Sequence, residues 1–386
     1  MNIKILFYTV FLTLLVTACV SEFKAKLSST GEQLLIVDGT IMEDTTVTFY
    51  LSKSFSMDSP TVPSDIFDIA ANVTIIGSNG YESAPATSLG KGAYAINVGE
   101  LDDSVNYGIR IEYDGNTYQS TLAKPISTPE IDSVSWTQPV KDGAVSFRVS
   151  THDDTGEARF FLWNYIENWE ITAYYNVSVF YNPTTDNFYS AGSTPYYYCW
   201  KSNVPREFLI GTTESLRENS IINKEIYNCP PGDDRFSYLY CVTVNQRAIS
   251  KAAFEYYQNK IVINNEMGGL FTPQPSELTG NITCVTDPSK KAMGYVETVK
   301  NTEQKRIFIY PNQVTMPGVL SFCSTITTDS VLSLSGSFSR AYYSGYRLID
   351  FDPAGNPADW STVNCTECTA NGGSKSKPDF WPNEDQ

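Results

Sequence analysis

The chain has 386 residues, a formal net charge of −16 and only 18% charged residues. A surface this acidic argues against nucleic acid as a partner and against electrostatic docking on anionic lipid. The length allows two or three domains. The 25 Tyr, 20 Phe and 24 Gly favour a mainly β protein with many turns.

The start of the chain has the pattern of an export signal. Lys4 precedes an apolar run over residues 5–16, which has secretory length and is too short to span a bilayer permanently. The run ends in the letters VTAC, which fit the bacterial lipobox, in which Cys19 becomes the first mature residue and carries the lipid. We therefore predict a signal peptide at 1–18 and a lipidated tether at 19–32. Acyl chains anchor a protein firmly, so the membrane is a predicted partner, contacted without being crossed.

Residues 33–128 are predicted to form a first β-sandwich of immunoglobulin or prealbumin type. Short runs of apolar and aromatic residues alternate with turn residues along this stretch. In the clearest run, Tyr107, Ile109 and Ile111 fall on one face, and an Asp-Gly hairpin turn follows. We expect this domain to act as a spacer or docking module.

Residues 129–386 are predicted to form a larger β domain that resembles a fibronectin type III sandwich. Prolines mark its start, and its strands are interrupted by a long irregular insertion at about 176–234. One helix is expected at about 250–263, with Ser250 as its N-cap and its apolar face on the second sheet. The tail after this domain's last strands is expected to be loop-like and held by disulfides.

Seven cysteines follow Cys19, and cysteines in an oxidising compartment are usually paired. Cys241 lies in a predicted strand, and we expect it to be the spare, buried thiol. Cys365 and Cys368 have a spacing that zinc sites, redox sites and disulfides share. Their neighbours are turn residues and glycines, which do not suit a redox helix, and zinc would need two further ligands.

The candidate disulfide cysteines are Cys199, Cys229, Cys284, Cys323, Cys365 and Cys368. Cys199 and Cys229 flank the insertion and form one possible pair. Cys365 and Cys368 are expected to pair with one another or with Cys284 and Cys323. Six cysteines allow 15 pairings, so the sequence leaves the connectivity open.

The sequence offers little for catalysis. His152 is the only histidine, in a segment that indicates a surface turn, so zinc held by histidines is excluded and a catalytic triad is unsupported. In the PPGDDRF segment, Asp233 and Asp234 are predicted to form a structural corner in which Arg235 pairs with one of them; a ligand or calcium site is the alternative. We expect no enzymatic activity, no metal and no cofactor.

Aromatic residues are dense around the insertion, above all in the letters PYYYCW. Consecutive tyrosines on one strand cannot all face one core, so some must be exposed. Exposed aromatic rings bind sugar rings or partner proteins through a large apolar face and a polar tip. The candidate ligand or partner contacts are Tyr196, Tyr197, Tyr198 and Trp200.

Four separated motifs occur in an order that resembles one family. They are NCPPGDDRFSYLYCVTV, the helical SKAAFEYYQNK, GGLFTPQPSELTGNITCV and CTECTANGGSKSKPDFWP. Together they resemble the Bacteroidota outer-membrane lipoproteins that carry the domain of unknown function 4249. The resemblance implies an outer-membrane lipoprotein, often associated with TonB-dependent transporters, and it supplies no catalytic residues.

These observations favour a non-enzymatic outer-membrane lipoprotein, anchored through Cys19 and exposed at the cell surface, with the periplasmic face of the membrane as the alternative. It is expected to assist nutrient uptake by a TonB-dependent transporter as an accessory or ligand-binding subunit. A structural or assembly protein of the envelope, docking to other outer-membrane proteins, is the alternative. A glycan hydrolase has the least support.

Overall fold

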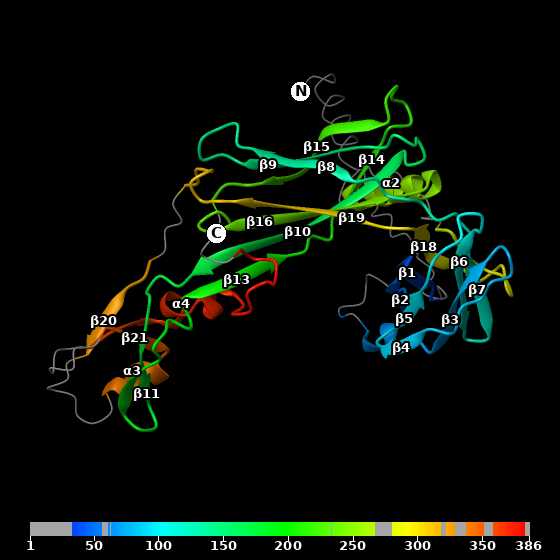
Figure 1. Ribbon diagram of the computed structural model, residues 1–386. Helices are drawn as coiled ribbons and strands as arrows, with labels where there is room; N and C mark the ends of the chain where they lie inside the picture. Colours follow the sequence, from blue (N-terminus) through cyan, green and yellow to red (C-terminus); the bar gives the residue numbers. More distant parts are fainter. Residues whose placement is uncertain are drawn as a thin grey trace, which may run out of the picture.

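The computed structural model of the chain describes residues 33–55, 61, 63–232, 234–266, 280–317, 322–328, 337–350 and 358–382. The chain forms a first sandwich, a larger second sandwich at the centre and a small third lobe at the far end (Figure 1). The predicted signal peptide and tether lie outside the described residues. None of the helices in the described part is long and apolar enough to cross a membrane.

The first sandwich packs two sheets with the strand orders β18-β1-β2-β5-β4 and β17-β7-β6-β3. The predicted inward face of β6 is confirmed, because Tyr107, Ile109 and Ile111 are all buried in the core between the sheets. The elements are β1 (Leu35–Met42), β2 (Thr45–Lys53), β3 (Ala71–Gly77), β4 (Thr87–Gly90), β5 (Ala93–Val98), β6 (Tyr107–Tyr113), β7 (Asn116–Ser120), β17 (Ile282–Cys284) and β18 (Ala292–Val299), with the 3₁₀ helix η1 (Ser64–Phe67).

The predicted boundary between the domains, 33–128 against 129–386, is wrong for two strands. β17 pairs with β7, and β18 runs parallel to β1, so both complete the first sandwich although they follow the second sandwich's helix in sequence. Parallel pairing of distant strands has no local turn signal that the sequence could show. Gly294 permits the close approach, because its φ is 128° and a Cβ there would lie 1.9 Å from the carbonyl oxygen of Val37.

The second sandwich has a three-stranded sheet, β15-β9-β8, and a larger sheet, β13-β10-β16-β19, in which β14 also pairs with β10. β13 and β14 share one edge of β10, so the larger sheet has four strand positions facing three, which is the arrangement of fibronectin type III domains. The predicted mainly β fold class is confirmed. The strands are β8 (Ile131–Thr137), β9 (Val145–His152), β10 (Phe160–Thr172), β13 (Tyr198–Asn203), β14 (Leu209–Thr212), β15 (Ser220–Cys229), β16 (Tyr240–Ala248) and β19 (Glu303–Ile309).

Strand β10 provides the centre of this core. Every second side chain along it points inward, and Phe161 and Trp163 are fully buried. The Trp163 indole nitrogen donates a hydrogen bond to Gln246 Oε1 at 2.8 Å, so its one polar atom is satisfied in the core. Glu167 is the exception in the inward row: it is fully buried, and it accepts a hydrogen bond from the Tyr240 hydroxyl at 2.8 Å. The core is therefore apolar at one end of β10 and polar near its middle.

Helix α2 (Lys251–Glu266) lies against the outer face of the larger sheet. Its predicted N-cap is confirmed, because Ser250 Oγ accepts a hydrogen bond from the backbone N–H of Ala253 at 3.1 Å. The Phe254 ring packs against Phe160 of β10, with 5.3 Å between ring centroids. The expectation of a single helix is wrong, because the described residues contain two further short helices in the third lobe.

The third lobe forms from the first part of the predicted insertion, residues 179–190, and the C-terminal region, which lie together at the far end of the molecule (Figure 1). The rest of the predicted irregular insertion at 176–234 supplies β13, β14 and β15 of the second sandwich, so that prediction is wrong. Its core surrounds the fully buried Trp360 and includes Tyr181 from the insertion and Leu348. The insertion and the tail are thus more regular than predicted, because Tyr181 of the insertion packs against Phe338 and Trp360 of the C-terminal region. The elements are β11 (Val179–Asn182), β12 (Asn187–Ser190), β20 (Thr325–Thr328), β21 (Tyr346–Asp350), β22 (Ala358–Thr362), α3 (Ser337–Tyr343), α4 (Val363–Thr366) and the 3₁₀ helix η2 (Cys368–Asn371).

A buried carboxyl group joins the two sandwiches. Glu297 of β18 is 1% exposed and accepts hydrogen bonds from Ser250 Oγ at 2.8 Å and Ser250 N at 3.3 Å. Nearby, Arg247 donates to Thr40 Oγ1 of β1. Burial raises the pKa of Glu297, and the bonds from Ser250 oppose the shift without cancelling it.

Glu297→Gln is expected to gain stability relative to wild type as the pH rises. Because the pKa of Glu297 is raised in the folded state, its contribution is fully present below the unfolded pKa of about 4.3 and is lost as the pH rises through the folded pKa. Calorimetric unfolding from pH 4 to 7 measures the difference. Glu218→Gln, at an exposed site, is the control. A constant difference between Glu297→Gln and wild type would contradict this account.

A tyrosine-lined cleft as the candidate functional site

One disulfide connects the third lobe to the second sandwich, and a second one lies within the third lobe. Cys199 of β13 pairs with Cys368 of η2, and Cys323 pairs with Cys365 of α4. Backbone hydrogen bonds continue the connection, because Trp200 and Ser374 exchange two bonds of 2.8 Å each. The tail therefore lies along the exposed edge of β13.

The disulfide predictions are partly confirmed. Cys365 and Cys368 do not pair with one another, and each closes a separate bridge to a distant segment. The expected pair of Cys199 with Cys229 is wrong, and Cys284 is in neither bridge; Cys229 and Cys284 are buried thiols. The Cys229 sulfur lies 3.7 Å from Arg235 Nη1, inside the sandwich, whereas Cys199 faces the tail. Cys241 is a buried thiol, as predicted, and burial raises its pKa to about 12, so it is not reactive.

A cleft of about 510 Å³, called here the junction cleft, opens beside the second disulfide, where the second sandwich meets the third lobe. Cavities of roughly 300–1,000 Å³ hold small ligands, so this volume suits a ligand or an inserted partner side chain. The lining comes from the end of β10, the segment before β13, the turn before β16 and the disulfide-linked segments of the third lobe. It consists of Ile171, Thr172, Ala173, Tyr174, Tyr197, Asp234, Ser237, Tyr238, Phe322, Cys323, Asn364, Cys365 and Asn371.

Exposed aromatic rings give the cleft apolar surface for binding. Tyr174 is 58% exposed and Phe322 is 90% exposed, although burying a ring is normally favourable. Tyr174 packs edge-on against Tyr175, with 4.9 Å between ring centroids, so its position is fixed even though its outer face is open to solvent. Exposed, fixed aromatic rings of this kind are typical of binding surfaces.

Polar groups between the rings can orient a ligand. Thr172 Oγ1 donates a hydrogen bond to the Tyr238 hydroxyl at 2.8 Å, and Asn371 Nδ2 donates to the Asn364 carbonyl oxygen at 2.8 Å. Burial, and then the neighbouring Tyr238, raise the pKa of Tyr197. Its phenol therefore stays uncharged at neutral pH and can both donate and accept a hydrogen bond.

The four predicted aromatic contacts separate in the structure. Tyr197 lines the cleft, and Tyr198 begins β13 with 41% of its side chain exposed. Tyr196 lies under Lys375, whose ammonium is 4.5 Å from the ring centroid, and Trp200 is half-buried in β13. Phe322 and Tyr238, which also line the cleft, carry no local sequence signal of this role, because it depends on the contact between the second sandwich and the third lobe.

The described residues of the predicted corner contact the strands of the second sandwich. Asp234 accepts hydrogen bonds from Lys201 Nζ at 2.6 Å and from the Trp169 indole nitrogen at 3.1 Å. Arg235 lies 3.3 Å from Glu167 Oε1, so it neutralises the buried carboxylate of β10. Asp233 lies outside the described residues. The expected role as a structural corner fits Asp234, which lies at the end of the cleft.

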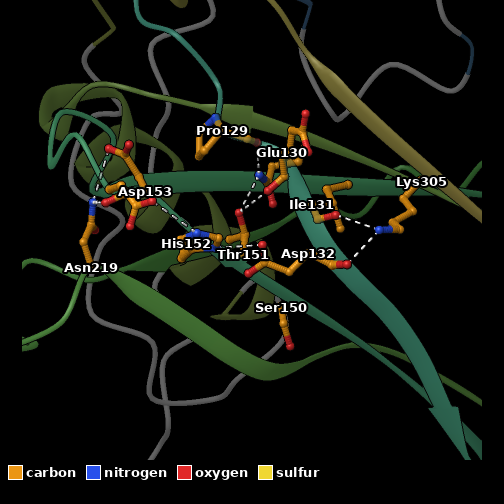
Figure 2. A network of polar contacts seen from close by, with 12 residues as sticks. Pro129, Glu130, Ile131, Asp132, Ser150, Thr151, His152, Asp153, Asn219 and Lys305 are labelled. Atoms are coloured by element: carbon orange, nitrogen blue, oxygen red, sulfur yellow. Dashed lines mark hydrogen bonds and ion pairs between the residues drawn. The ribbon is translucent and has the colours of Figure 1, made fainter.

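His152 forms an exposed pair with an aspartate (Figure 2). Its Nδ1 lies 2.7 Å from Asp132 Oδ1, and its Nε2 lies 3.7 Å from Asp154 Oδ2. Ser150 points away from the imidazole in Figure 2, and its Oγ accepts the backbone N–H of Asn223 at 3.0 Å. Ser150 is therefore not placed as a nucleophile at this pair, and no group of three metal-ligating side chains occurs in the described residues.

The chain is a mainly β protein with two sandwiches and a disulfide-linked aromatic cleft. The family model named domain of unknown function (DUF4249) matches residues 20–305, so the chain belongs to this family. No curated protein matches it. Among solved structures, a two-domain fibronectin type III segment from chicken tenascin aligns with 56% of this chain and 91% of its own length, at 9% identity and a TM-score of 0.17.

Removing the Cys199–Cys368 bridge with a double alanine substitution is expected to cost about 2–5 kcal/mol of unfolding free energy. This bridge joins residues 169 apart, against 42 for Cys323–Cys365. Because loop-closure entropy grows with the logarithm of length, the longer bridge should contribute about 1 kcal/mol more. Urea unfolding of the two double variants measures the difference. Equal losses, or none for Cys199–Cys368, would contradict the expectation.

The imidazole of His152 should titrate above the ordinary value of 6.5. The hydrogen bond to Asp132 is the main cause of the raised pKa, followed by the charge of the same group. Asp132→Asn should bring the pKa back toward 6.5, while Asp154→Asn, the control at 3.7 Å, should change it less. Proton NMR of the only histidine in the chain measures this directly. An unchanged pKa in Asp132→Asn would show that the pair does not form.

Proposed function

We propose that this chain is an outer-membrane lipoprotein, anchored through Cys19 and exposed at the cell surface, that serves a TonB-dependent transporter as a non-enzymatic ligand-binding or accessory subunit. The predicted signal and lipobox support the anchor, and the two disulfides suit an oxidising compartment. The proposal also rests on the resemblance that the sequence motifs show to Bacteroidota lipoproteins.

The observation that carries the binding role is the cleft beside Cys323–Cys365. Its exposed rings, Tyr174 and Phe322, provide apolar contact area, and its amide, carboxylate and phenol groups provide hydrogen bonds. The disulfide fixes the segment that carries Phe322, so little conformational entropy is lost when a partner or ligand binds. Such preorganised aromatic contacts dominate the energy of many interfaces.

A pull-down from solubilised outer membranes tests the proposal. The wild-type chain should retain a TonB-dependent barrel in stoichiometric amount, identified by mass spectrometry. Tyr174→Ala combined with Phe322→Ala should reduce the retained barrel about tenfold or more, as expected when aromatic anchors are lost. Tyr50→Ala in the first sandwich is the matched control, since Tyr50 is 56% exposed against 58% for Tyr174.

The pull-down also distinguishes the alternative. If the wild-type chain retains only assembly factors or other envelope proteins, the transport role is wrong and a structural role replaces it. If the barrel is retained equally by the double variant and by Tyr50→Ala, the transporter association stands but the cleft is not its contact. Melting temperatures within a few degrees of wild type establish that each variant is folded.

A further inference from the structure

The second sandwich is open along one side. β13 pairs with β10 up to the pair Asn203–Glu167, and β14 resumes the pairing at Leu209–Trp163. Between these two pairs, three residues of β10, 164–166, lie opposite five residues of the other chain segment, 204–208. The segment 204–208 therefore has two extra residues, which must bulge outward. Pro205 lies in this segment and cannot donate a ladder hydrogen bond.

The facing sheet is irregular on the same side. Its edge strand β15 shifts register between Glu225 and Tyr227, which pair with adjacent residues of β9, so Ile226 is an extra residue. A bulge of this kind bends a strand and redirects its side chains. The two interruptions lie on either side of a cavity of about 740 Å³, called here the side cavity. Its lining is Tyr165, Arg206, Glu207, Phe208, Leu209, Glu225, Ile226, Tyr227, Asn228 and Ile261.

Two stacked rings form the inner wall of the side cavity. Tyr165 and Tyr227 lie with 4.6 Å between ring centroids and 27° between ring planes. Phe147 stacks behind Tyr227 at 6.0 Å and 11°, so the pair is held from the core side. Leu209 and Ile226 add aliphatic surface. The wall is flat and apolar, and it suits a ring system better than a chain-like ligand.

One polar group in this wall is open to the cavity. Tyr165 is 4% exposed and lines the side cavity, and no described residue forms a hydrogen bond with its hydroxyl, whose oxygen keeps contact with the cavity solvent. Buried polar groups in proteins are nearly always hydrogen-bonded, to protein, water or ligand. Burial raises the pKa of Tyr165 far above physiological pH, so the group is a neutral phenol that can donate or accept.

The rim of the side cavity does not select a charge. Arg206 carries the opposite sign to Glu207 and Glu225, and all three are exposed. A charged ligand would therefore lose hydration inside without gaining a partner ion. We propose that the side cavity binds a flat, uncharged ring compound with a hydrogen-bonding group, seated against Tyr165 and Tyr227 and bonded to the Tyr165 hydroxyl. This site is separate from the junction cleft and independent of the transporter role.

Indole and 1-methylindole are suitable probes, because they share one ring system and only indole has an N–H to donate. Saturation-transfer NMR on the full processed chain detects binding as weak as a dissociation constant of about 1 mM. Both probes should bind wild type, and indole should bind more tightly than 1-methylindole because its N–H can donate a hydrogen bond to the Tyr165 hydroxyl. Tyr165→Phe, which removes only the hydroxyl, should bring the two affinities together within about twofold, because the one hydrogen bond is lost.

Filling the cavity provides the second test. Leu209→Trp should weaken both probes about tenfold or more, while Ile222→Trp, which adds the same ring to β15 at a site 71% exposed, should leave them unchanged. If Leu209→Trp unfolds, Ile261→Trp fills the cavity from α2 instead.

The proposal is overturned if the cavity-filling variants bind the probes as well as Ile222→Trp does. It is also overturned if wild type shows no saturation transfer to either probe. A preference for indole that persists in Tyr165→Phe overturns the role of the hydroxyl. Tyr174→Ala with Phe322→Ala should retain probe binding, which separates this test from that of the transporter role.

Discussion

The arrangement of the two sandwiches depends on one almost continuous strand path. β18 pairs with β1 in the first sandwich, and after three residues the chain enters β19 of the second. The segment between β7 and β8, which also joins the first sandwich to the second, passes the same point. Its Thr128 exchanges backbone and side-chain hydrogen bonds with Asn301, at 2.7 to 2.9 Å. Two chain connections and the buried Glu297 contact therefore meet at one junction, which restricts hinge motion between the sandwiches.

The third lobe is stabilised differently. Among the residues that the structure describes, the buried members of its hydrophobic core are Tyr181, Ala341, Leu348, Ala358 and Trp360, which is a small apolar volume. Small cores leave little net stability after the entropy of folding, and such units commonly require disulfides. The two bridges supply that support and at the same time position Phe322 beside the cleft. Stability and the candidate binding site thus depend on the same covalent links.

Both cavities lie where regular strand pairing stops. The junction cleft begins where β10 ends and the chain leaves the sandwich for the insertion. The side cavity lies where β13 gives way to β14 and β15 carries its bulge. A fully paired sandwich would cover the inward side chains of β10, so these interruptions are what allows Tyr165 to line the side cavity and the end of β10 to line the junction cleft.

The sequence by itself determined the local features: the mainly β character, the alternating face of β6, the Ser250 cap of α2 and a buried thiol at Cys241. Each depends on neighbours within a few residues, through periodicity, capping or turn chemistry. Only the tertiary structure decided that β18 joins β1, which cysteines pair, and that the insertion folds with the tail. These contacts join segments far apart in the chain, and their register depends on the packing of whole sheets, which no local pattern encodes.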